Sequence, residues 1–226
     1  MATESLFARL SAAAADDWQA YCHHRFVAGL ADGSLPESAF RHYLIQDYLF
    51  LIQFARAYAL AAYKADNLDD MRAASATLAA IIDVEMGLHV SYCADWGLTE
   101  ADMAGAPEAL ETTAYTRFVL DLGLGGDSLD LMAALAPCVN GYGVIGARLA
   151  ADPATKHDGN PYASWIDMYA GDEYQEVCRA AIAQLDRLAA ARGGDARFDD
   201  LAKTFSQATR LEIAFWEMGW AAQGDG

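Results

Sequence analysis

The sequence feature that most constrains the fold is an apolar repeat with the helical period, which runs through almost the entire chain. Apolar side chains return every three or four positions, which places them on one face of an α-helix. No turn of the Asn-Gly type separates two stretches of alternating apolar and polar residues, the pattern that would indicate a β-hairpin. The sequence therefore predicts an all-α bundle of about seven or eight helices.

Glycine, proline and capping residues divide this pattern into segments. Ser34 and Glu37 have the spacing of a capping box, with Pro36 in the first turn of the helix that follows. Asn67 or Asp69 can cap a third long helix. Helices are expected over residues 5–31, 34–65, 67–96, 106–122, 128–151, 162–170, 172–192 and 196–222. With few prolines and no low-complexity segment, residues 1–226 are expected to form a single domain.

The composition excludes some classes of protein. The chain has 32 acidic and 15 basic residues, for a net charge of −17, and this disfavours a nucleic-acid-binding surface because phosphate contacts need clustered Lys and Arg. The four cysteines form no Cys-x-x-Cys pair and are interpreted as free thiols in a reducing compartment. No signal peptide and no uncharged apolar run of about 18 residues is visible. A cytoplasmic protein without a membrane span is therefore expected.

A proline and a cysteine stand together inside the apolar segment 128–151. Pro137 lacks a backbone donor and clashes with the carbonyl four residues earlier, so a bend is expected there. Cys138 follows directly, and Tyr142 lies one turn further along the same helix face. Two interpretations remain open on these residues alone: a buried packing pair, which is common for free cysteine, or a reactive site.

Two acidic residues interrupt helix faces that are otherwise apolar. Asp47 has large apolar neighbours on nearly every side, and Glu212 lies one turn before Phe215. Each is either exposed on an outer stripe or buried with partners, because an unpaired buried charge is very unfavourable. A buried Glu212 is expected to have a raised pKa, which suits a general acid or base near neutral pH. Tyr115 and Tyr169 also lie on mainly apolar helices, where phenols usually belong to the core.

Glu85 and His89 are separated by one helical turn and could contribute two ligands to a metal site. A di-iron site in a bundle needs four carboxylates and two histidines from several helices, and the other histidines provide no second pair. A hydrogen-bonded structural pair is therefore the favoured interpretation, and no metal site is predicted.

Taken together, these stretches resemble the TenA family, also called thiaminase II or aminopyrimidine aminohydrolase. The resemblance follows the chain in order through residues 40–51 (FRHYLIQDYLFL), 85–89 (EMGLH), 114–116 (AYT), 137–142 (PCVNGY), 165–174 (WIDMYAGDEY) and 212–216 (EIAFW). It implies a haem-oxygenase-like fold without haem or another cofactor, and commonly a homotetramer. It also implies the cysteine-containing branch of the family, because Cys138 occupies the position of the catalytic thiol.

The resemblance assigns catalytic roles to Cys138 and Glu212, and a substrate-binding role to Asp47. Cys138 would be the nucleophile that adds to carbon six of an aminopyrimidine. Glu212 would protonate the ring and later move protons for the attacking water. Asp47 would hydrogen-bond the ring nitrogen and the exocyclic amine.

Five aromatic residues complete the expected site. Tyr115, Tyr142 and Tyr169 would line the pocket and bond to the substrate, the thiol or the glutamate, and Phe215 would pack on the ring. Phe50 occupies a position where well-known members carry tyrosine, so one hydroxyl near the nucleophile is missing here.

The implied reaction is hydrolysis of 4-amino-5-aminomethyl-2-methylpyrimidine, and more slowly of thiamin, to the hydroxymethylpyrimidine used in thiamin salvage. The alternatives are a non-catalytic pyrimidine-binding or indirectly regulatory protein, since family members are often labelled transcriptional activators, and a metal-dependent oxygenase that uses Glu85 and His89. Small molecules, and neither nucleic acid nor a membrane, are the expected partners.

Overall fold

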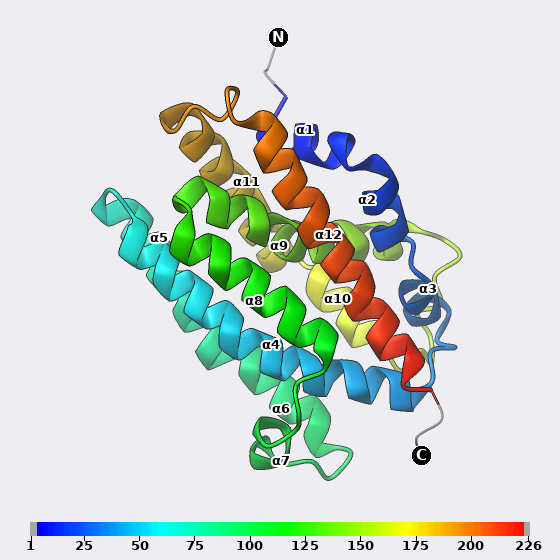
Figure 1. Ribbon diagram of the computed structural model, residues 1–226. Coiled ribbons are helices and arrows are strands. Elements are labelled where there is room, and N and C mark those ends of the chain that lie inside the picture. Colours follow the sequence, from blue (N-terminus) through cyan, green and yellow to red (C-terminus); the bar gives the residue numbers. More distant parts are fainter. Residues whose placement is uncertain (1–3, 224–226) are drawn as a thin grey trace.

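The computed structural model describes residues 4–223, and every regular element in that range is a helix (Figure 1). The predicted all-α architecture is therefore confirmed. The helices are α1 (Leu6–Ala13), α2 (Ala15–Cys22), α3 (Arg25–Asp32), α4 (Glu37–Lys64), α5 (Leu68–Ala80), the π-helical turn η1 (Ile81–Glu85), α6 (Met86–Ala94), α7 (Glu100–Ala104), α8 (Leu110–Gly125), α9 (Ser128–Ala151), α10 (Ala163–Ala170), α11 (Asp172–Ala191) and α12 (Phe198–Ala221).

The segment expected to be one helix, residues 5–31, consists instead of α1, α2 and α3. The chain turns at Ala14 between the first two, and at His23 and His24 between the second and third. The His24 ring accepts a hydrogen bond from the Phe26 amide at 3.2 Å and so caps α3. The apolar period continues through both turns, so periodicity alone could not locate them.

Helix starts differ from expectation at two further places. Pro36 occupies the N-cap of α4, so the capping box expected between Ser34 and Glu37 does not form. The short helix α7 was not predicted, and it begins at a capping box in which the Thr99 hydroxyl accepts from the Asp102 amide and the Asp102 carboxylate accepts from the Thr99 amide. Asn67 caps α5 as one of the two expected residues.

Helix α9 occupies the centre of the bundle and packs against α8, α10, α11 and α12 (Figure 1). It continues through Pro137, and most of its side chains are buried. Gly146 allows α10 to approach closely, because a Cβ atom there would lie 2.6 Å from the backbone carbonyl carbon of Tyr169. Gly141 similarly makes room for the ring of Tyr21. Small residues in α9 therefore set the position of the helices that contribute aromatic side chains to its two sides.

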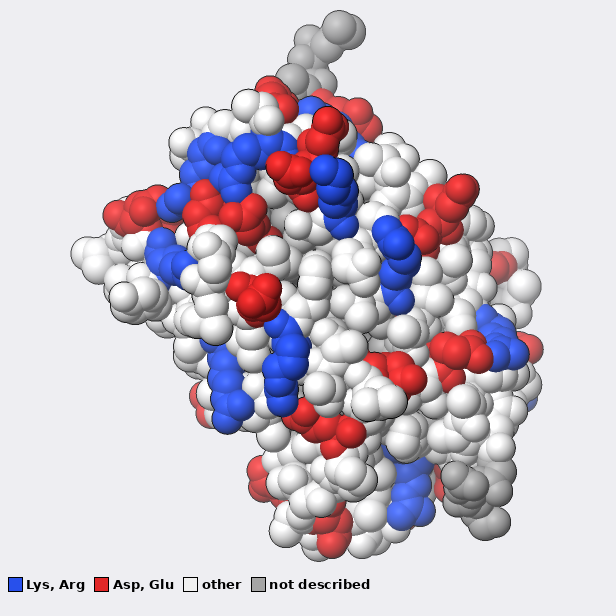
Figure 2. Space-filling model, in the orientation of Figure 1, with Lys and Arg blue, Asp and Glu red and all other residues white. Residues whose placement is uncertain are grey.

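Two segments are long and apolar enough to span a membrane by length and composition alone, residues 68–94 and 128–151. The second is the core helix α9, and 83% of its most apolar window is buried inside the protein. Such burial is typical of the central helix of a bundle. On the face seen in Figure 2, basic side chains lie next to acidic ones.

Candidate active site

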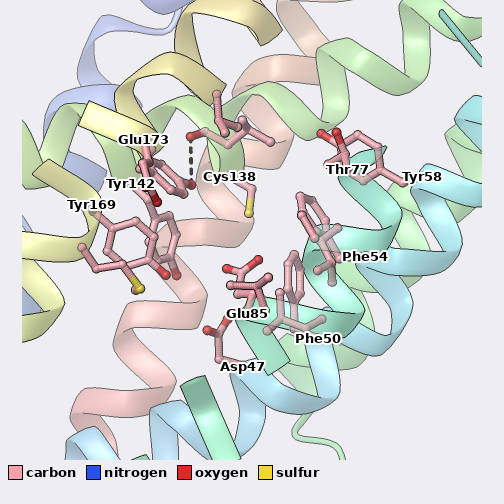
Figure 3. A pocket seen from close by; sticks show the side chains of 18 of the residues that line it. Asp47, Phe50, Phe54, Tyr58, Thr77, Glu85, Cys138, Tyr142, Tyr169 and Glu173 are labelled. Carbon is pink, nitrogen blue, oxygen red and sulfur yellow. Dashed lines mark hydrogen bonds between the residues drawn. The ribbon is translucent and has the colours of Figure 1, made fainter. Parts of the chain in front are cut away.

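A cavity of about 530 Å³ opens between α4, α5, η1, α9, α10 and α11 (Figure 3). Its walls are mainly apolar and aromatic, with Phe50, Phe54 and Tyr58 contributed by α4. The groups that can form polar interactions with a bound molecule include Asp47, Glu85, Cys138, Tyr142 and Tyr169. An apolar cavity with a few converging polar groups is typical of a site for a small organic molecule.

Five of the eight residues expected in the site line this cavity, namely Asp47, Phe50, Cys138, Tyr142 and Tyr169. The other three, Tyr115, Glu212 and Phe215, are buried beside them, each with no more than 2% of its surface exposed. The structure therefore brings all eight together in two layers, one that lines the cavity and one that supports it.

Glu212 in the supporting layer is connected to the Cys138 thiol. The Tyr115 hydroxyl donates a hydrogen bond to Glu212 Oε1 at 2.8 Å. Burial raises the pKa of Glu212 to about 8, and the charge of Asp47 adds to this, although hydrogen bonds with Tyr115, Cys138 and Tyr21 oppose it. At neutral pH the carboxyl group is therefore mostly protonated and can donate a proton.

The pKa of the Cys138 thiol is raised well above its usual value, first by burial and then by the charges of Glu212, Asp47 and Glu85. At neutral pH Cys138 is therefore a neutral thiol. It is nevertheless half-buried and lines the cavity wall, whereas Cys22, Cys93 and Cys178 are buried. Neighbouring Pro137 has its carbonyl directed to the Tyr21 hydroxyl at 3.5 Å.

Asp47 is buried and paired, which decides between the two interpretations of this residue. Its Oδ2 atom lies 2.6 Å from Nε2 of His89 and 3.4 Å from the Tyr43 hydroxyl. Nδ1 of His89 lies 2.9 Å from the backbone carbonyl of Glu85, so this nitrogen carries a proton. Burial opposes a positive charge on His89, but the hydrogen bond and charge of Asp47 raise its pKa overall. The pairing with Asp47 therefore favours the imidazolium form of His89.

Aromatic rings form the rest of the site. The Phe50 ring packs against Tyr115 and Phe215, with centroid distances of 5.0 and 5.8 Å. On the opposite wall the Tyr142 ring lies 4.9 Å from that of Tyr169, and its hydroxyl lies 3.4 Å from the Tyr43 hydroxyl. Phe215 packs behind Phe50, in the supporting layer, and Phe50 provides the aromatic surface that lines the cavity.

Four residues that the sequence pattern does not indicate also belong to the site or support it: Tyr21, Tyr43, Glu85 and His89. Glu85 and His89 were recognised as a pair one turn apart, but His89 bonds to the Glu85 carbonyl oxygen and to Asp47 of another helix. Nothing in the local pattern identifies a partner 42 positions away. Within residues 4–223 there is no group of three or more His, Cys, Asp or Glu side chains arranged to hold a metal ion.

Comparison with known proteins shows which family the chain belongs to. The profile of the TENA/THI-4/PQQC family matches residues 12–222. The chain belongs to this family. An aminopyrimidine aminohydrolase of Halalkalibacterium halodurans is 37% identical over 203 residues, which cover 90% of each chain. The aminopyrimidine aminohydrolase of Helicobacter pylori is 32% identical and covers 90% of this chain and 93% of its own. The predictions of the TenA family and of a hydrolase are thereby confirmed.

The solved structures agree with this assignment. A TenA family transcription regulator from Silicibacter sp. TM1040 superposes with a TM-score of 0.90 at 47% identity, over 95% of this chain and 96% of that one. A domain of unknown function from Shewanella denitrificans OS217, 14% identical, has a haem-oxygenase-like fold and superposes with a TM-score of 0.74 over 98% of this chain and 94% of its own. The chain therefore has the haem-oxygenase-like fold that the resemblance implied.

Proposed function

We propose that this chain is an aminopyrimidine aminohydrolase that converts 4-amino-5-aminomethyl-2-methylpyrimidine, and more slowly thiamin, to 4-amino-5-hydroxymethyl-2-methylpyrimidine in thiamin salvage. The observation that carries the proposal is the contact between the cavity-lining Cys138 and the buried Glu212, whose pKa is raised to about 8. A nucleophile beside a group that is still protonated at neutral pH is the pairing that this chemistry requires.

The first step forms a bond between Sγ of Cys138 and carbon six of the ring. Ring nitrogen one is bonded to that carbon, so the Glu212 carboxyl that contacts the thiol also lies near this nitrogen. Glu212 donates its proton to the nitrogen and then accepts the thiol proton as the bond forms. The net transfer moves the thiol proton to the ring and leaves Glu212 protonated, so no free thiolate is needed before the substrate binds.

The Asp47–His89 pair orients the substrate for this addition. The Asp47 carboxylate, held by His89, accepts a hydrogen bond from the exocyclic amine. Phe50 and Tyr142 bound the ring on the two walls of the cavity. The 4-amino group then supplies the electron pair that expels the substituent on the methylene, and water adds to the exposed carbon.

The test is turnover of purified protein with the aminomethylpyrimidine, followed by detection of hydroxymethylpyrimidine and ammonia. Wild-type protein is expected to form both products, and Cys138→Ala and Glu212→Gln to form neither above background. Absence of turnover of this compound and of thiamin by folded wild-type protein rejects the proposal. Calorimetric binding of the product without any turnover would instead identify a pyrimidine-binding protein.

We also propose that the chain assembles as a homotetramer in the cytoplasm. Exposed apolar side chains are concentrated on the segment from α4 to η1, including Tyr63, Leu68, Ile82 and Val84. Apolar side chains gathered on one segment of the surface favour a contact with another chain. Light scattering coupled to size-exclusion chromatography tests the assembly, and a monomer at micromolar concentration would contradict it.

A further inference from the structure

Glu85 lines the cavity, and its carboxylate has no role in the proposed addition of Cys138 to the pyrimidine. It is the last residue of η1, a single π-helical turn between α5 and α6, and turns of this kind occur frequently at functional sites. No hydrogen bond to its carboxylate is found among residues 4–223, and its backbone carbonyl oxygen accepts one from Nδ1 of His89. Figure 3 shows Glu85 between Cys138 and Asp47, with its side chain directed into the cavity.

The order of atoms in the pyrimidine indicates what this carboxyl group faces. Asp47 holds the amine on carbon four, and Cys138 attacks carbon six. Carbon five lies between these two ring atoms and carries the methylene and the leaving group. A side chain located between Asp47 and Cys138 is therefore adjacent to the bond that breaks.

We propose that Glu85 selects an amine as the leaving group by binding the nitrogen on the methylene and supplying the proton with which it departs. This inference rests on the proposed function. In the cysteine adduct the bond from carbon four to the exocyclic nitrogen becomes double, the pair between carbons four and five shifts to form the exocyclic methylene, and the carbon–nitrogen bond breaks. The pair from that bond passes to nitrogen, which takes the proton of Glu85 and leaves as ammonia.

The same carboxylate completes the cycle. Water adds to the methylene carbon and gives its proton to Glu85, while the electron flow reverses and the thiolate leaves carbon six. The proton on ring nitrogen one returns through Glu212 to the thiolate, which restores the aromatic ring and the resting thiol. The two glutamates thus divide the proton transfers, with Glu212 serving the ring and the thiol and Glu85 serving the substituent. Burial, assisted by Asp47 and opposed by His89, raises the pKa of Glu85 to about 7, so both of its forms are available near neutral pH.

Thiamin provides the discriminating comparison. Its leaving group is a cationic thiazolium that departs as a neutral thiazole and needs no proton. Glu85→Gln keeps the size of the side chain but cannot donate or accept the proton. It is expected to lower kcat with the aminomethylpyrimidine by about 100-fold, the lower range for loss of a general acid, and to change kcat with thiamin by about threefold or less. Glu85→Asp is expected to recover part of the amine activity.

The control is Asp121→Asn, which removes the same charge from an exposed residue of α8 that does not line the cavity, and it is expected to leave both activities within about twofold. Equal losses with both substrates in Glu85→Gln would indicate a structural role and overturn the inference, as would retention of both. If wild-type protein turns over neither substrate, the proposed function itself fails, and this result is distinct from a failure of the Glu85 assignment.

Discussion

Nε2 of His89 lies 2.6 Å from Oδ2 of Asp47, and the exposed fractions of the two side chains are only 4% and 7%. Removing one member of a buried ion pair leaves an uncompensated charge, which lowers the free energy of unfolding by about 3–5 kcal/mol. His89→Gln is therefore expected to be destabilised by an amount of this order at pH 6, measured by urea denaturation. It is also expected to have a raised KM, because Asp47 loses its orientation. His157→Gln, at an exposed histidine, should leave both quantities unchanged.

The Asp47–His89 pair also predicts how the stability difference between wild type and His89→Gln varies with pH. Despite the opposing effect of burial, the partnership with Asp47 raises the pKa of folded His89 above the value of about 6.5 expected in the unfolded chain. The stability contributed by His89 is thus fully present below pH 6.5 and is lost as pH rises through the folded-state pKa. The gap between wild type and His89→Gln should shrink in alkaline solution. A gap that grows with pH would contradict the imidazolium assignment.

Glu212 predicts a second pH dependence. Burial raises its folded pKa to about 8, against about 4.3 in the unfolded chain. Between these values the folded state retains a proton that the unfolded state has lost, so the stability contributed by this group declines as pH rises from 5 to 8. Glu212→Gln, which stays neutral, should lack this decline and exceed wild type in stability at pH 9. Denaturant midpoints over this range, with Glu173→Gln as the control, provide the measurement.

The activity should also depend on the protonation of Glu212. If protonated Glu212 donates to the ring, kcat/KM of wild type is expected to fall about tenfold for each pH unit above the pKa of about 8. A rate that stays level up to pH 10 would mean that another group supplies the ring proton.

The helical period made the fold predictable, because a bundle requires only that apolar faces recur along each segment. The same signal could not locate the turns at Ala14 and His23, where the apolar period continues across a break in the backbone. Local sequence also left Asp47 undecided between an exposed and a buried position. Its state depends on His89, on a different helix, and this contact is a property of tertiary packing alone.

The candidate site was predictable only through the family resemblance. Pro137 and Cys138 on their own are compatible with a packed core, since a buried free cysteine is common. The resemblance identified Glu212 and Tyr115. In the structure the Tyr115 hydroxyl lies 2.8 Å from Oε1 of Glu212. Residues 85–89 carry part of the resemblance, but it gave Glu85 no role in the site. Glu85 ends a π-helical turn in the middle of segment 67–96, which reads as one continuous helix.

The close packing of α9 on α10 gives a prediction about geometry. A Cβ atom added at Gly146 would lie 2.6 and 2.8 Å from backbone atoms of Tyr169 and Ala170, which cannot move without shifting α10. Gly146→Ala is therefore expected to lower the free energy of unfolding by about 1–3 kcal/mol and to raise KM, because Tyr169 moves with α10.

Gly87→Ala is the control, since nothing lies within 4 Å of its added Cβ atom, and it should stabilise α6 by about 0.5–1 kcal/mol. Unchanged KM in folded Gly146→Ala would show that Tyr169 does not contact the substrate.

The raised pKa of Cys138 predicts a thiol that is unreactive until the substrate arrives. Iodoacetamide reacts with the thiolate, and burial together with Glu212 and Asp47 suppresses that form. At pH 7.5 alkylation of Cys138, followed by mass spectrometry, is expected to be at least about tenfold slower than that of free cysteine, whose pKa is about 8.5. Its rate should rise with pH throughout the range from 7 to 9.

Cys138→Ser is the control, because its alkylation measures the background from the three buried cysteines. Alkylation faster than that of free cysteine would show that the resting cavity already stabilises the thiolate, and the proton transfer through Glu212 would then not be needed for attack.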